Sequence, residues 1–312
     1  NQRALEVSAG LNFRWSPSRY FNLELLDSFT RSVQARNSFT VTGNSASTTL
    51  SQDLNRATLR ANIIPGGGRL SFGVGYSLNL NMFEDKGFDS ANKLVHEIDF
   101  QGKFKLLPKT ALTLDVVQQF TGYTASPAGG GGNIDSKPFR AYLGFMGLLT
   151  PNLSIVLKAG YGNSIHATGN SYSSVLAKAE IGYAIGPMGK LKVGFERSFS
   201  DSQFANYYSD NKAYAGYDHF IASRFVLHLD AAYTRRDFGG FPGGGIGGVT
   251  SLGENLLTGG LSFDYQIKEW IYVGLGYDLQ LQGVSSNNPS SPVVGLLDFT
   301  RHQVYGKVGI SY

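Results

Sequence analysis

The sequence ends with the stretch VYGKVGISY, residues 304–312. Residues that could face lipid alternate in it with residues that would lie on the opposite face of a strand. Successive side chains of a β-strand point to opposite faces, so this alternation predicts a strand with two different faces. The face that could contact lipid holds Val304, Gly306, Val308, Ile310 and Tyr312, and the other holds Tyr305, Lys307, Gly309 and Ser311. Transmembrane strands need ~9–11 residues with this period. The stretch therefore predicts a membrane-spanning strand that ends on an aromatic residue.

The same pattern recurs about fifteen times along the chain, and no helical stretch separates the repeats. Regular examples are residues 5–15, 70–80, 175–183 and 271–280. Short turns, at 16–19, 65–68, 107–110, 150–152, 186–189 and 268–270, alternate with long polar or glycine-rich segments, at 33–52, 121–138, 236–254 and 283–297. A large soluble β-sandwich, the alternative, has no reason to segregate its loop lengths in this way. The pattern predicts an all-β fold, a single transmembrane antiparallel up-and-down β-barrel over residues 1–312.

Composition excludes several other classes of protein. No run of roughly 18–20 apolar residues is present, so a bundle of transmembrane helices is excluded. Mean hydropathy is only −0.13, as expected if each strand turns its apolar residues to one face. Cysteine is absent, which excludes disulfides and thiolate metal sites. The net charge of +4 is spread along 312 residues, so we expect no nucleic-acid partner.

Parity of the strands predicts an orientation and a further strand. In outer-membrane barrels short turns face the periplasm and long loops face outward, so the long loops here would be extracellular and Tyr312 periplasmic. With about fifteen strands, Asn1 would then lie on the outer side. Bacterial single-chain barrels have even strand numbers. We therefore expect at least one strand ahead of Asn1, with sixteen or more in the complete protein; a miscount at 205–235 is the alternative. No secretory leader is present, so we expect a processed or trimmed chain.

The inward faces of the strands are predicted to line a lumen. Acidic and basic residues there nearly cancel, which predicts a mixed polar wall rather than one that selects a single sign of charge. The predicted lumen-lining residues are Arg14, Arg56, Arg60, Lys103, Asp115, Arg140, Tyr142, Lys158, Lys178, Glu180, Lys192, Glu196, Asp230, Asp264, Asp278, Gln280, Arg301 and Lys307. Several inward positions are small, which could leave an aqueous channel or accommodate a plug. Residues 33–52 and 236–254 are the expected constrictions.

Aromatic residues cluster near the predicted strand ends. Such clusters form girdles where a barrel meets the two membrane interfaces. The predicted interface aromatics are Trp15, Tyr183, Tyr265, Trp270, Tyr277 and Tyr312.

The sequence offers few groupings of residues that are typical of catalytic or metal-binding sites. We expect neither an enzyme nor a bound cofactor. His228 and Asp230 share an inward face two residues apart, and Thr234 lies further along it, which makes them the best candidates for acid–base chemistry. No nucleophile motif accompanies them. The glycine runs at 129–132 and 243–248 do not precede helices, so they are read as surface loops rather than phosphate-binding loops.

Three segments carry a resemblance to a known family: LLPKTAL at 106–112, LLTPNLSIVLKAGYG at 148–162 and FERSFSDSQFANYYSDN at 195–211. With the strand spacing, they resemble the β-barrel porin 2 family of bacterial outer-membrane proteins, of the myxobacterial and delta-proteobacterial type. The resemblance implies an outer-membrane location and, for some members, polysaccharide export together with a periplasmic export component. It implies no catalytic residue.

Three functions follow as hypotheses. The first is a channel that exports polysaccharide or oligosaccharide, with Tyr142, Tyr272, Asp278, Gln280 and Gln282 as a contact surface. The second is a diffusion porin for small hydrophilic solutes. The third is a shell, embedded in outer-membrane lipid, that encloses or docks a partner protein such as a lipoprotein, a secretion component or an electron carrier. A barrel enzyme is the most distant alternative.

Overall fold

The computed structural model describes residues 7–39, 45–84, 89, 91–124, 134–202, 205–222, 224–241, 249–289, 294 and 298–310. These residues form one antiparallel sheet of fifteen strands, each paired with its neighbours in sequence. The strands are β1 (Val7–Ser18), β2 (Phe21–Phe39), β3 (Ser45–Ile63), β4 (Leu70–Phe83), β5 (Lys93–Leu107), β6 (Thr110–Tyr123), β7 (Phe139–Thr150), β8 (Leu153–Asn163), β9 (Ser173–Ile185), β10 (Gly189–Asp201), β11 (Tyr207–Ile221), β12 (Phe225–Gly239), β13 (Leu252–Lys268), β14 (Ile271–Ser286) and β15 (Phe299–Ile310). The predicted all-β class and strand count are confirmed.

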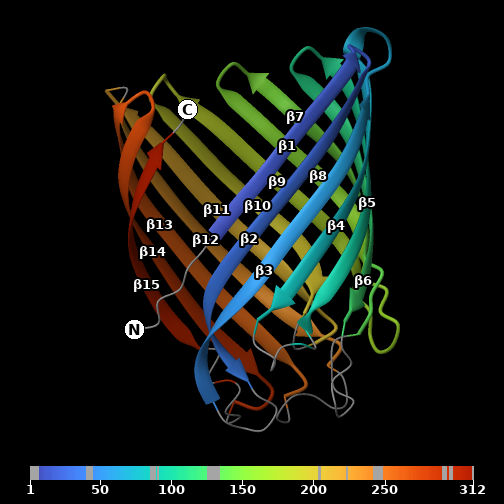
Figure 1. The fold of residues 1–312 in the computed structure, drawn as a ribbon, viewed down its shortest axis with the longest axis vertical. Coiled ribbons are helices and arrows are strands. Elements are labelled where there is room, and N and C mark those ends of the chain that lie inside the picture. Colours follow the sequence, from blue (N-terminus) through green and yellow to red (C-terminus); the bar gives the residue numbers. More distant parts are fainter. Residues whose placement is uncertain are drawn as a thin grey trace.

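The sheet curls into a barrel, with β1 to β4 crossing the front of the view and β9 to β13 forming the wall behind them (Figure 1). Short turns lie at the top of the figure, and the longer connections lie at the bottom. The end of β15 lies at the short-turn end, because Ile310 pairs with Ile271, the first residue after a short turn. No helix among the described residues is long and apolar enough to cross a membrane.

The strand register separates an apolar convex face from a polar concave face. Leu275, Val304 and Val308 are 69%, 78% and 70% exposed on the convex face, although they are large and apolar. An outward apolar band of this kind is how a barrel meets lipid. Among the predicted interface aromatics, Trp15, Tyr183 and Trp270 are about half exposed. Tyr265 stacks on Phe225 and Tyr277 contacts His302, while Tyr312 lies outside the described residues.

The two edges of the sheet run in the same direction. Both β1 and β15 run toward the short-turn end, since both are odd-numbered in an antiparallel order. No ladder joins these two strands within the described residues. The further strand expected from parity stays a prediction.

Several connections differ from those expected from sequence. The loop predicted at 33–52 is wrong, because β2 and β3 stay paired from Val33 and Ser51 out to Phe39 and Ser45. The polar composition of this stretch predicted a loop, but the backbone pairing of two strands does not require an apolar face. In the same way β12 runs to Gly239, β13 begins at Leu252 and β14 runs to Ser286, so the predicted loops 236–254 and 283–297 are shorter than expected. The glycine runs at 129–132 and 243–248 lie outside the described residues.

Candidate functional site

The register places all the predicted lumen residues on the concave face. Around β3 to β5, for example, Arg60 pairs with Gly75, which pairs with Asp99 on its other side. Around β9 to β11, Glu196 lies between Lys178 and Lys212. The contact of these residues with a solute stays a prediction.

Several ion pairs on this face bridge strands that are not neighbours, and two of them cross a glycine of the strand between. Arg60 of β3 contacts Asp99 of β5 at 2.6 Å across Gly75, the register partner of both. Lys307 of β15 contacts Asp264 of β13 at 2.7 Å across Gly274 in the same way. A Cβ atom at either glycine would overlap the carboxylate that covers it. These small inward residues therefore make room for bridging side chains rather than for empty channel.

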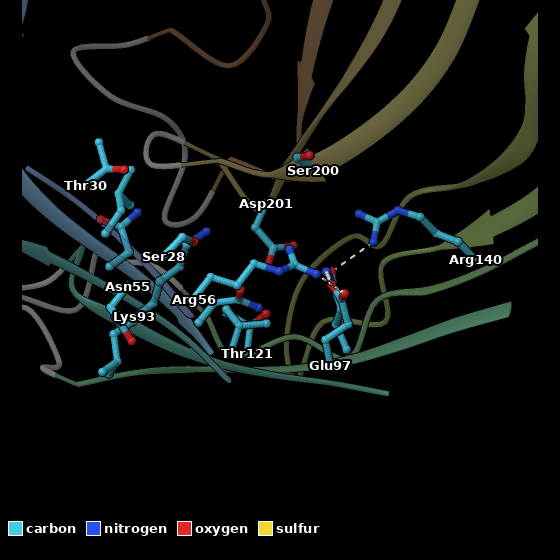
Figure 2. Close-up of a pocket in the computed structure, with 16 residues that line it drawn as sticks. Ser28, Thr30, Asn55, Arg56, Lys93, Glu97, Thr121, Arg140, Ser200 and Asp201 are labelled. Carbon is cyan, nitrogen blue, oxygen red and sulfur yellow. Dashed lines mark hydrogen bonds and ion pairs between the residues drawn. The ribbon is translucent and has the colours of Figure 1, made fainter. Parts of the chain in front are cut away.

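A polar cavity of about 450 Å³ lies on the concave face at the long-connection end, and we call it the mouth cavity. Inward residues of β2 to β7 form most of its wall, including Ser28, Arg56, Asn81 and Lys93. Ser200 and Asp201, at the end of β10, complete the lining, and Figure 2 shows Asp201 hanging into the cavity apart from the strands that carry Arg56 and Lys93.

A chain of hydrogen bonds makes one part of this wall rigid. Arg56 Nη2 donates to Glu97 Oε1 at 2.7 Å, and Gln119 Nε2 donates to Glu97 Oε2 at 2.6 Å. Arg140 Nη1 then donates to Gln119 Oε1 at 2.9 Å, and its Nη2 donates to the carbonyl of Phe199, also at 2.9 Å. The chain links β3, β5, β6, β7 and β10, and Figure 2 shows Arg140 reaching toward the side of the cavity that holds Glu97.

The tip of the β10–β11 hairpin, which the structure describes at residues 198–202 and 205–208, leaves the barrel wall. Pairing between β9 and β10 stops at Arg197, whereas pairing between β10 and β11 continues to Asp201 and Tyr207. The Phe199 ring lies where a Cβ atom of Gly162 would be, and Gly162 shares the concave face with Arg140. The hairpin tip is thus folded onto the inside of β7 to β9. It narrows the mouth, and neither predicted constriction included it.

Polar contacts hold the hairpin tip to two connections. Ser136 Oγ donates to Asp201 Oδ2 at 2.6 Å, and Asn206 Nδ2 donates to the carbonyl of Asn170 at 3.0 Å. The Nε2 atom of buried His166 lies 2.8 Å from the carbonyl oxygen of Asn206. Because a carbonyl oxygen can only accept, this nitrogen is the donor. The Ser164 hydroxyl lies 3.0 Å from His166 Nδ1 and already accepts from the amide of Tyr172. The hydroxyl can then donate to Nδ1 of a neutral ring, and burial lowers the pKa of His166 against the opposing effects of Asp201 and Asn206.

The segment FERSFSDSQFANYYSDN, quoted above for its family resemblance, contains the whole hairpin tip. Its polar Asp-Ser and Asn-Tyr-Tyr groups were the only sequence signal that could have pointed to the hairpin tip. Their inward fold could not be inferred, because it depends on contacts with residues about 30–70 positions away, such as Ser136 and Asn170.

A second hollow, of about 860 Å³, follows the wall from β8 to β13 toward the short turns. Its charged residues include Lys178, Lys190, Lys192 and Lys212 beside Glu180, Glu196, Asp218 and Asp230. Tyr214 donates to Glu180 at 2.6 Å, and Lys178 pairs with Glu196 at 3.3 Å. Both signs of charge alternate along this wall.

His228, Asp230 and Thr234 share the concave face as expected, but the contacts of His228 are with other strands. His228 Nδ1 lies 2.7 Å from Asp218 Oδ1, and its Nε2 lies 3.6 Å from Asp264 Oδ2. Residues two apart on one strand point the same way but lie about 7 Å apart. His228 therefore contacts closer side chains on neighbouring strands. Among the residues that the structure describes, no three His, Asp or Glu side chains gather to hold a metal ion.

Solved outer-membrane transporters match this chain over almost its full length. The apoprotein form of the FrpB iron transporter from Neisseria meningitidis matches with a TM-score of 0.61 at 7% identity, covering 98% of this chain and 56% of that one. The ferric citrate transporter FecA in its unliganded form matches with a TM-score of 0.57 at 11% identity, covering 97% and 55%. The copper transporter OprC matches with a TM-score of 0.52 at 7% identity, covering 96% and 56%.

No protein-family model matches the sequence, and no curated protein matches it. This chain spans a little over half the length of the three solved barrels named above. At these identities the likeness shows the fold alone. The chain therefore has the antiparallel barrel fold of bacterial outer-membrane transporters.

Proposed function

We propose that this chain forms an outer-membrane channel that passes small hydrophilic solutes along its concave face. The mouth cavity carries the proposal. It has a volume of about 450 Å³, and polar groups of β2 to β7 line it opposite the hairpin tip. The proposal gains support from the barrels that share this fold, whose names describe transporters of iron, ferric citrate and copper. We also propose that the long connections are extracellular and that the end of β15 is periplasmic.

Liposome swelling tests this function. Vesicles that contain the chain should swell in small sugars at a rate that falls with the size of the sugar. Ser28→Trp places a large ring in the mouth cavity and should slow swelling several-fold, whereas Ala57→Trp, on the convex face of the neighbouring strand, should leave the rate unchanged. Absence of swelling with a correctly folded barrel would overturn the proposal.

Polysaccharide export and the shell for a partner protein stay predictions. The hairpin tip supports passage of small solutes over passage of a polymer, because it lies on the inside of β7 to β9 at the mouth. Loss of surface polysaccharide in a deletion strain would favour export instead, and a stoichiometric protein that copurifies with the barrel would favour the shell.

A further inference from the structure

The short-turn end of the barrel carries an excess of basic side chains. Exposed basic residues lie in or directly beside five different short turns, and we call them the basic rim: Arg19, Arg69, Lys109, Arg224 and Lys268. Among the described residues of the short turns, Glu269 is the one acidic residue. The short turns therefore carry a net positive charge.

The other end of the barrel has the opposite balance of charge. In the parts of the long connections that the structure describes, acidic side chains outnumber basic ones, with Glu84, Asp89, Asp135 and Asp298 against Lys137. The two ends therefore differ in the charge that they present to a membrane. A preference for an anionic partner belongs to the short-turn end.

Three cations of the basic rim lie over aromatic rings that are themselves exposed. The distances from cation to ring centroid are 4.7 Å for Arg19 over Tyr20, 5.0 Å for Arg69 over Phe104 and 5.8 Å for Lys268 over Trp270. A ring attracts a cation without cancelling its charge. The ion pairs between described residues involve no member of the basic rim. The rim thus presents positive charge to whatever lies beside it.

Phe104 shows which way one of these cations faces. It pairs in register with Leu70 and Leu112, and its ring is 37% exposed on the convex face that meets lipid. Arg69 therefore lies where the convex face ends, with its apolar stem near the ring. Long basic side chains at a membrane interface place their stems along apolar surface and their charges among the headgroups.

We propose that the basic rim binds anionic phospholipid headgroups in the membrane leaflet at the short-turn end. The lipid phosphate accepts hydrogen bonds, and the guanidinium groups of Arg19 and Arg69 can each donate two to it. A zwitterionic headgroup brings a cation of its own, which the rim repels, so the rim favours a headgroup with a net negative charge. The position of Arg69 at the convex edge favours lipid over an acidic protein as the partner.

Quenching of tryptophan fluorescence by brominated lipids tests this surface. The chain has two tryptophans, and both report on the short-turn end, because Trp15 pairs with Leu23 near one short turn and Trp270 lies in another. The folded barrel is placed in mixed bilayers in which either phosphatidylglycerol or phosphatidylcholine carries the same dibrominated acyl chains. The ratio of the two binding constants should favour phosphatidylglycerol about fivefold, which corresponds to about 1 kcal/mol for a basic residue near an anionic surface.

Two triple variants separate the basic rim from other cations that lie over rings. The rim variant combines Arg19→Gln, Arg69→Gln and Lys268→Gln, and its ratio should fall to near one. The matched control removes three lysines that lie over Phe220 and Tyr214 on the concave face, as Lys190→Gln, Lys192→Gln and Lys212→Gln. The control should keep the native ratio, and circular dichroism checks the fold of both variants.

Salt gives a second measurement that needs no variant. In 1 M NaCl the screening length is about 3 Å, so the ratio of the native chain should fall toward one. Equal quenching by the two lipids in the native chain at low salt would overturn the proposal, and so would a rim variant that folds and keeps the native ratio. Neither result depends on conduction, so the lipid surface and the channel succeed or fail separately.

Discussion

The Ser136 hydroxyl donates a 2.6 Å hydrogen bond to Asp201, which ties the hairpin tip to the connection between β6 and β7. The same carboxylate lies 3.7 Å from the buried imidazole of His166 in the next long connection. Asp201 therefore joins three segments that are far apart in sequence and holds them over the mouth. If the barrel conducts as proposed, these contacts should set the width of its mouth.

Phe199→Ala should widen the mouth. The Phe199 ring is 2% exposed, packs against Leu176 and lies 4.3 Å from the guanidinium of Arg140, so truncation removes the apolar anchor of the hairpin tip. Core Phe→Ala changes cost about 3–5 kcal/mol, more than a short hairpin tip is expected to tolerate. Single-channel conductance should rise and fluctuate more. Phe120→Ala, on an exposed ring of β6, provides the comparison, and equal conductance in both variants would contradict this account.

Acid should loosen the hairpin tip. The pKa of His166 is lowered in the folded state, so the folded connections favour the neutral ring. Their stability is then full above the ordinary histidine pKa of about 6.5 and falls as the pH drops through it. Between pH 7.5 and 5, current fluctuations should increase in the native chain.

His166→Gln should remove this pH response, because glutamine can still donate to the Asn206 carbonyl but takes up no proton. His219→Gln, which removes an imidazole bonded to Tyr217, should retain the response. A native chain whose current fluctuations are the same at both pH values would count against this role of His166.

Gly75→Ala should destabilise the barrel. The added Cβ would overlap the Asp99 carboxylate and disturb its ion pair with Arg60. We expect a loss of about 1–3 kcal/mol, the usual cost of overpacking, as measured by urea unfolding in detergent micelles. Gly122→Ala, where an added Cβ meets nothing within 4 Å, should change stability far less. Equal stability of the two variants would refute the close bridging over Gly75.

Lys307 and Asp264 should be energetically coupled. They lie 2.7 Å apart across Gly274, and the Asp264 side chain is only 17% exposed. A double-mutant cycle with Lys307→Met and Asp264→Asn should give a coupling energy of about 1 kcal/mol in the same unfolding assay. A coupling near zero would mean that the pair is as weak as an exposed surface ion pair.

Sequence alternation was enough to predict the strands and their faces. The pattern in β14, where Ile271, Val273 and Leu275 alternate with Tyr272 and Gly274, is visible without any structure, and the register confirms it. Alternation could not predict partners such as Asp218 for His228, because they depend on the register between strands. It also could not show that Gly75 and Gly274 are covered by side chains from neighbouring strands.

The segments 33–39 and 45–52 could not be predicted as strands, because their sequence is largely polar. Only the pairing between β2 and β3 reveals them. The hairpin tip escaped prediction because its inward fold is set by distant contacts, chiefly those of Asp201 and Asn206.

Planar-bilayer recording of the purified, folded chain tests the central claim most directly. A concave face that carries a hydrophilic path with both signs of charge predicts stable conductance steps, with a reversal potential near zero in a salt gradient. Insertion of correctly folded barrels without any conductance steps would contradict the account.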